Sequence, residues 1–157
     1  MDVWLENMGS DQRFDYSVLG DSVNLAARLE GQSKSYGVKT VIGPETHESV
    51  KDNYATLQLD IIAVKGKKEA VTIFTLAGDE VFKESSEFKN LESKHKKILE
   101  YYFNQKWKSC FNEMKLAKML CNNLMSEYYE ILSERINEYE KNPPPENWDG
   151  VYIATSK

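Results

Sequence analysis

The sequence changes its periodicity near Gly78 and Asp79, and this change limits the possible folds more than any other feature. Before it, short runs alternate apolar and polar residues, which is typical of strands. After it, apolar residues return every three or four positions, which is typical of amphipathic helices. Strands and helices kept in separate stretches indicate the α+β class. We therefore expect an α+β part over residues 1–79, followed by an all-α extension over 80–157 that resembles a single repeat.

The first forty residues predict a strand followed by a helix. Apolar and polar residues alternate over 14–19, which favours a strand. Asp21 or Ser22 can cap a helix that runs to Tyr36. Gly37 then supplies the left-handed residue with which helices commonly end.

The next stretch predicts further strands. The β-branched run 38–42 favours a short strand, and 44–51 favours a turn of helix. Residues 57–64 and 70–76 are each rich in apolar and β-branched side chains and are separated by Lys-Gly-Lys-Lys at 65–68. This arrangement predicts a β-hairpin.

Three helical segments follow, and 143–145 is Pro-Pro-Pro, which stops the last one. The stretch after the prolines, including 148–151, is expected to be a turn or an extended tail. One helical hairpin cannot form a solenoid, which needs about three repeats. We expect a helical cap on the preceding part, with a peptide-binding groove as the alternative. The apolar stripes comprise Phe88, Leu91, His95, Ile98 and Tyr102; Trp107, Cys110, Phe111, Met114 and Ala117; and Leu124, Tyr128, Ile131, Arg135 and Tyr139.

Composition excludes several classes of protein. Twenty Lys and Arg residues against 25 Asp and Glu give a net charge of −5, so the chain lacks the basic excess of nucleic-acid-binding proteins. No apolar run is long enough to span a membrane, and the first residues do not resemble a signal peptide. We expect a cytoplasmic chain without nucleic acid as a partner. Cys110 and Cys121 are expected to be reduced core residues.

One segment carries residues that suit phosphate chemistry. Asn24 and Arg28 are four residues apart near the start of the predicted helix, so both side chains project from one face. A helix N-terminus favours negative charge, and a guanidinium can donate a fork of hydrogen bonds to phosphate oxygens. Such a face suits a polyphosphate, although an Asn and an Arg at this spacing are also common on solvated surfaces.

The wider motif closely resembles the signature of class III nucleotidyl cyclases, which form cyclic AMP or cyclic GMP from a nucleoside triphosphate. The resemblance covers roughly residues 7–77. It takes in Asn-Met-Gly-Ser at 7–10, Arg13, Tyr-Ser-Val-Leu-Gly-Asp at 16–21, Val-Asn-Leu-Ala-Ala-Arg-Leu-Glu at 23–30 and Val-Lys-Gly-Lys at 64–67. It implies part of a ferredoxin-like catalytic domain.

The resemblance also implies roles for four residues. Asn24 would position the ribose, and Arg28 would stabilise charge on the phosphates as the 3′-oxygen attacks. Lys65 would contact the terminal phosphates. Ser17 occupies the position that reads the purine, and its hydroxyl can both accept and donate, which favours ATP over GTP.

The chain departs from the family in one respect that matters for activity. The two Asp motifs that bind Mg²⁺ or Mn²⁺ in a complete cyclase are missing. We therefore expect the isolated chain to be inactive and to require a complementing cyclase domain or a homodimer. A non-catalytic half-cyclase that pairs with and regulates another cyclase is the alternative. The helical tail resembles the ends of bacterial adenylate cyclases that are anchored in the membrane by preceding segments.

Overall fold

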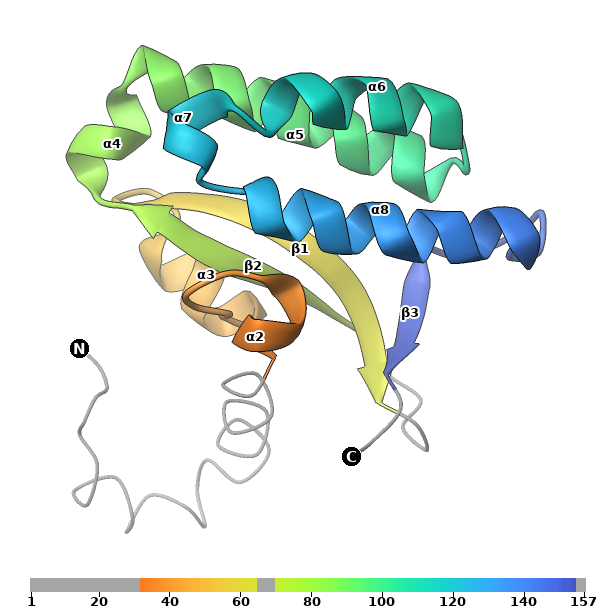
Figure 1. Ribbon diagram of the computed structural model, residues 1–157. Coiled ribbons are helices and arrows are strands. Elements are labelled where there is room, and N and C mark those ends of the chain that lie inside the picture. The colour runs from red at the N-terminus through yellow and green to blue at the C-terminus, as the bar shows by residue number, and fades with distance from the viewer. Residues whose placement is uncertain (1–31, 65–69, 155–157) are drawn as a thin grey trace, which may run out of the picture.

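The computed structural model describes residues 32–64 and 70–154, which form two short helices, a three-stranded sheet and a layer of helices (Figure 1). The elements are α2 (Ser33–Tyr36), α3 (Pro44–Val50), β1 (Ala55–Val64), β2 (Ala70–Gly78), α4 (Glu80–Glu84), α5 (Ser86–Phe103), α6 (Trp107–Ala117), α7 (Leu120–Asn123), α8 (Ser126–Lys141) and β3 (Val151–Ala154).

The sheet has the order β2-β1-β3. Strands β1 and β2 pair antiparallel, which confirms the predicted hairpin. Strand β3 comes from the C-terminal end of the described chain and pairs parallel to β1, with Ile61 opposite Val151 and Val64 opposite Ala154. The longest strand therefore lies in the middle, between its sequence neighbour and a strand from the far end of the chain.

A β-bulge in β1 changes which residues of this strand are buried. Gln58 pairs with Phe74 and Asp60 pairs with Ile73, so Leu59 has no partner on β2. A bulge of this kind puts two residues opposite one and shifts the alternation of side chains. As a result the consecutive residues Leu59 and Asp60 are both almost fully buried.

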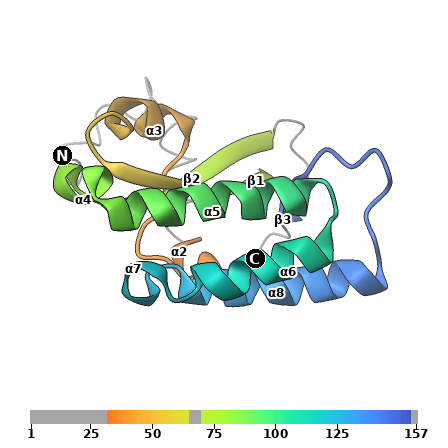
Figure 2. The same ribbon diagram turned by 90° about the horizontal axis from the view of Figure 1, so that it is seen from above.

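Helices cover the two faces of the sheet unequally. Helix α5 lies over β1 and β2, with α6 and α8 beside it (Figure 2). On the other face α3 packs against β2, where the ring of His47 stacks on Phe74 with 3.6 Å between ring centres. Most of the buried apolar residues of the described strands and helices belong to one hydrophobic cluster.

Local capping explains where the first helices of this layer begin. Strand β2 ends at Gly78, and the Asp79 carboxylate accepts a hydrogen bond from the Phe82 amide at 2.9 Å, which caps α4. Ser85 caps α5 in the same way through the Phe88 amide at 3.1 Å. Side chains of this type favour helix starts because they satisfy amides that lack a partner within the helix.

The predicted strand over 14–19 and the predicted helix start at Asp21 or Ser22 lie outside the described residues. From residue 32 to β1 the structure agrees with expectation except at 38–42. Gly37 ends α2 with φ of 65°, as predicted, and α3 lies where a turn of helix was expected. The predicted strand over 38–42 was wrong, because only Ile42 forms a bridge, to Phe74. At Thr40 the contact with β2 is made by the side chain, because its hydroxyl accepts a hydrogen bond from the Leu76 amide at 3.2 Å.

The helical half also differs from expectation in two details. The prediction of an all-α extension was wrong for the end of the described chain, because β3 joins the sheet there. The third helical segment also buries a face that differs from the predicted one. Leu124 is 38% exposed, whereas α8 buries Tyr128, Tyr129, Leu132 and Ile136. The stripes on α5 and α6 agree better with the structure, since all five predicted α5 residues are buried.

Candidate functional site

The four predicted site residues, Ser17, Asn24, Arg28 and Lys65, lie outside the described residues. The structure does describe the segments that follow or precede them. Helix α2, which begins at Ser33, lies at the end of the stretch for which a helix carrying Asn24 and Arg28 was predicted. Strand β1 ends at Val64, directly before Lys65. The described part of the chain therefore shows what holds these two flanking segments in place.

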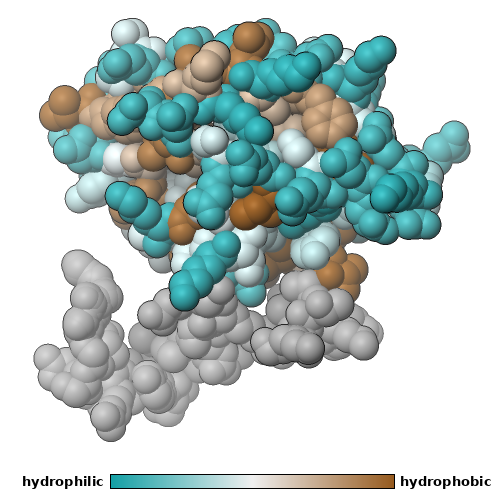
Figure 3. Space-filling model, viewed as in Figure 1, coloured by the Kyte–Doolittle hydropathy of each residue, from teal (hydrophilic) through white to brown (hydrophobic). Residues whose placement is uncertain are grey.

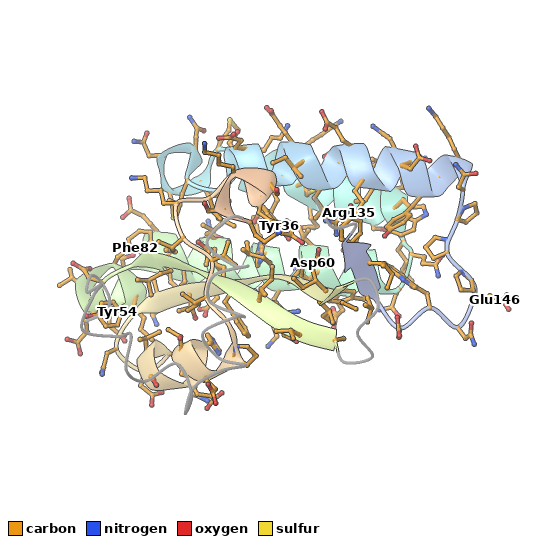
Figure 4. The ribbon with its side chains drawn as sticks, turned by 90° about the horizontal axis from the view of Figure 1, so that it is seen from below. Tyr36, Tyr54, Asp60, Phe82, Arg135 and Glu146 are labelled. Carbon is orange, nitrogen blue, oxygen red and sulfur yellow. The ribbon has the colours of Figure 1, made fainter. Side chains whose placement is uncertain are left out.

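Asp60, in the middle of β1, is the point where these segments meet. Its side chain is 1% exposed, and Oδ2 accepts a hydrogen bond from the Tyr36 hydroxyl of α2 at 2.7 Å. The Arg135 guanidinium of α8 donates to the same oxygen at 2.7 Å. The Ile61 amide donates to Oδ1 at 2.9 Å. Figure 4 shows Tyr36, Asp60 and Arg135 converging between the strand and α8.

Charge and burial act in opposite directions on this carboxyl. Burial raises the pKa of Asp60, whereas the neighbouring Arg135 and the hydrogen bond from Tyr36 counteract that rise. Arg135 is charged at any physiological pH, and its side chain is only 13% exposed. An uncompensated charge in such a place is costly, so each partner makes the burial of the other possible.

Arg135 also joins α8 to α5 and β3. Its Nη1 donates to the Tyr102 hydroxyl of α5 at 3.0 Å. Its guanidinium carbon lies 3.7 Å from the centre of the Tyr152 ring on β3, the geometry of a cation–π interaction. The single side chain of Arg135 therefore contacts a strand, a neighbouring helix and the C-terminal strand.

The carbonyl groups at the β1 bulge are satisfied by helix side chains. The Tyr128 hydroxyl donates to the Leu59 carbonyl at 2.6 Å, and His95 Nε2 lies 2.5 Å from the Gln58 carbonyl. His95 Nε2 must carry the proton, because a carbonyl can only accept, so Nδ1 accepts from the Tyr129 hydroxyl at 2.8 Å. Burial lowers the pKa of His95 to about 4, so the ring is neutral at pH 7.

This cluster of hydrogen-bonded side chains around Asp60 and His95, called the joint below, links β1 to the helices and offers no reactive group. Both oxygens of Asp60 accept hydrogen bonds, and both nitrogens of His95 are engaged. Among residues 32–64 and 70–154 no three His, Cys, Asp or Glu side chains come together as a group that could hold a metal ion. The described residues therefore do not fit the Mg²⁺ or Mn²⁺ that the cyclase resemblance implies.

Sequence reasoning missed the joint, although two signals were present. Asp60 is a carboxylate inside the apolar run Leu-Gln-Leu-Asp-Ile-Ile, and Arg135 occupies an inward position of a helical stripe. A charged residue at a buried position requires a partner of opposite charge. Pairing the two across 75 residues needed the fold, because no local pattern links them.

Two further observations bear on the class of protein. In the part of the chain that the structure describes, no helix is long and apolar enough to cross a membrane. Large apolar side chains that reach the surface are separated by hydrophilic ones on the face drawn in Figure 3. The fold and the joint together define an α+β module in which a layer of helices covers one face of a three-stranded sheet and the short helix α3 packs on the other.

The family of this module is given by its sequence. Residues 3–78 match the family model described as adenylate and guanylate cyclase catalytic domain, so this segment of the chain is of the class III nucleotidyl cyclase family. The match ends at Gly78, where β2 also ends.

Three relatives extend this finding. The chain is 32% identical over 72 residues to "Adenylate cyclase 1" of Rhizobium meliloti and 35% identical over 75 residues to "Adenylate cyclase" of Anabaena cylindrica, each match covering 46% of the chain. It is 32% identical over 130 residues, 81% of the chain, to "Adenylate cyclase, terminal-differentiation specific" of Dictyostelium discoideum. The chain spans 11%, 15% and 5% of these relatives, respectively. No solved structure matches it significantly.

The match to the Dictyostelium protein is longer than the cyclase segment. A match of 130 residues cannot fit before Gly78, so it must continue into the helices at least as far as α6. The similarity therefore includes part of the helical region as well as the hairpin.

Proposed function

We propose that the chain supplies the nucleotide-binding side of an adenylate cyclase site. The reaction converts ATP to 3′,5′-cyclic AMP and pyrophosphate. The observation that carries this proposal is the family match over residues 3–78, which includes Ser17, Asn24, Arg28 and Lys65. The activity belongs to the cytosolic side of a cell, where nucleoside triphosphates are present, whether or not a parent protein is anchored in a membrane.

Each of the four residues has a part in this proposal. Ser17 contacts the adenine, Asn24 orients the ribose and Lys65 binds the terminal phosphates. The ribose 3′-hydroxyl gives up its proton to water and its oxygen bonds to the α-phosphorus. The bond from that phosphorus to the oxygen between the α- and β-phosphates breaks, and pyrophosphate leaves. Arg28 stabilises the negative charge that develops on the phosphates, which in other enzymes is worth about 3 kcal/mol per well-placed donor.

The described fold supports this arrangement indirectly. Strand β1 runs from Asp60, which accepts a hydrogen bond from Tyr36 of α2, to Val64, the residue before Lys65. An extended strand rises about 3.3 Å per residue, so Val64 lies roughly 13 Å along β1 from Asp60. Helix α2 and β1, which flank the segments that carry Arg28 and Lys65, are therefore tied together through Tyr36 and Asp60.

In this proposal the metal ligands come from outside residues 1–157. We infer that residues 1–79 form part of a cyclase catalytic domain and that a complementing domain, or a second copy in a longer parent protein, brings the two carboxylates. Residues 80–157 form its C-terminal extension, in which α4 to α8 are followed by β3. Mg²⁺ or Mn²⁺ would bind on the partner's side of the site.

The proposal is tested by complementation. The full chain is mixed with a cyclase domain that keeps its metal-binding carboxylates but lacks its own counterparts of Asn24 and Arg28, and cyclic AMP is measured by chromatography with ATP or GTP as substrate. We expect cyclic AMP from ATP, and a loss of about 100-fold or more in Arg28→Ala. Lys39→Ala, a change of an exposed cation in a neighbouring segment, is the matched control. Equal turnover by Arg28→Ala would contradict the assigned role.

A non-catalytic half-cyclase is the second candidate. The observation that favours it is the lack of a metal-binding group among the described residues. In that case the chain would form a stable complex with a complete cyclase and change its rate, while the complementation mixture would make no cyclic AMP.

A further inference from the structure

The C-terminal strap, defined as residues 142–154, returns from the end of α8 to the edge of β1. Its last part is β3, which pairs with β1 over 61–64. Its middle part is held by Trp148, whose ring centre lies 5.3 Å from both Tyr102 and Tyr139. Gln105 Nε2 donates to the Pro145 carbonyl at 2.9 Å. The strap thus contacts the sheet and both α5 and α8.

Docking of the strap and burial of the central ion pair depend on each other. The Tyr152 ring covers Arg135 at 3.7 Å, while Arg135 holds Asp60 at 2.7 Å. If β3 left β1, water would reach the guanidinium and the ion pair would weaken, because charge pairs are strong only where water is excluded. The edge of β1 would lose its partner strand at the same time.

The strap is also the part of this assembly that can open most easily. Strand β3 has four residues, Ile153 is 56% exposed, and the other residues of the strap are mostly exposed or half-buried. Segments with few buried contacts open locally at a lower cost than the core. Opening would therefore release Arg135 without unfolding α5 or α6.

We propose that the C-terminal strap sets the geometry of the cyclase segment, with Arg135 as the positioning residue that transmits its docking to β1 and α2. Arg135 acts through Asp60, which also binds Tyr36 at the end of α2. The effect on catalysis rests on the proposed function, whereas the effect on β1 and α2 does not. A docked strap holds the nucleotide-binding segments at a fixed spacing, and a released strap lets them separate.

The first test is hydrogen exchange of the full chain, followed by mass spectrometry. Tyr152→Ala removes the ring over Arg135, and we expect exchange at least tenfold faster in peptides that cover 33–36 and 61–64. Peptides of α5 and α6 should stay within twofold of the unmodified chain. Tyr152→Phe keeps the ring and should behave like the unmodified chain. Glu146→Gln is the matched control, because Glu146 is exposed and lies far from Asp60 (Figure 4).

The outcomes of this exchange test are distinct. Faster exchange confined to the two peptides supports the proposal. Unchanged exchange at 61–64 in Tyr152→Ala would overturn it, and so would equal acceleration in α5 and α6, which would mean general destabilisation.

The second test uses the complementation mixture and measures kcat and KM for ATP. Wrong spacing of the binding segments should raise KM at least fivefold in Tyr152→Ala, with rescue in Tyr152→Phe. A purely structural role would lower the amount of folded protein and therefore kcat alone, which would overturn the proposal. A mixture in which the unmodified chain makes no cyclic AMP would refute the proposed adenylate cyclase function and the strap's role in catalysis, while the exchange result would still decide the strap's role in the fold.

Discussion

Acidification should destabilise the fold through one residue, His95. Its side chain is 2% exposed, and burial lowers its pKa to about 4, compared with 6.5 in an unfolded chain. Between these two values the unfolded state binds more protons than the folded state. The free energy of unfolding must therefore fall as the pH falls through this window.

The magnitude follows from the two pKa values. A difference of one pKa unit corresponds to about 1.4 kcal/mol, so the full effect below pH 4 is about 3 kcal/mol. Between pH 7 and pH 5 the loss is about 2 kcal/mol. A loss of this size is a large part of the stability of a small domain, which is typically about 5–15 kcal/mol.

Urea unfolding followed by tryptophan fluorescence at pH 7 and pH 5 measures this loss. His95→Gln removes the titrating group, and its amide can still donate to the Gln58 carbonyl, so the loss should shrink by about 2 kcal/mol. The chain has one other histidine, His47, and His47→Gln is the control that should keep most of the pH dependence. Carboxylates titrate in all three proteins and cancel in the comparison. An equal loss in His95→Gln and the unmodified chain would refute the argument.

Three further predictions concern stability and thiol reactivity. Asp60→Ala should lower the free energy of unfolding in urea by about 3–5 kcal/mol, because it leaves Arg135 buried without a counter-charge. The double variant Asp60→Leu with Arg135→Met should recover much of this loss. A loss in the double variant equal to the sum of the two single losses would contradict this reasoning. Gly150→Ala should lower the free energy of unfolding by about 1–3 kcal/mol in the same assay. Gly150 has φ of 83°, and a Cβ there would lie 2.7 Å from an aromatic ring of α5. An unchanged free energy of unfolding would contradict the expected strain. Burial raises the pKa of Cys110 to about 12, so a thiol reagent at pH 8 should label only the half-buried Cys121 in the native chain, and equal labelling would contradict the fold.

Local patterns in the sequence were enough to predict the hairpin and most helix positions. The apolar runs on either side of Lys65 gave β1 and β2, and the stripe from Phe88 to Tyr102 gave the buried face of α5. These features succeed because they depend on neighbours within a few residues. The cyclase motif could also be identified, since most of its residues lie close together between 7 and 30, although the positions of its side chains remain predictions.

Contacts between residues that are far apart in the sequence could not be predicted from it. The bulge at Leu59 shifts the buried positions of β1, and nothing near it in the sequence requires that shift. Strand β3 follows three prolines and has only four residues, so it was expected to be a tail. Its position depends on the open edge of β1 and on Arg135, which are both distant in the sequence.

The strap changes how the helical region should be interpreted. A helical cap on a finished sheet would contact it through apolar side chains alone. Here the helices complete the sheet: Tyr128 and His95 satisfy carbonyls at the bulge, and Arg135 neutralises the buried Asp60. Without the helices β1 would expose a carboxylate and two unpaired carbonyls on its covered face, so burial of this strand requires the region beyond Gly78. Similarity to the Dictyostelium cyclase also continues past that residue, which is consistent with a hairpin and helices that function together.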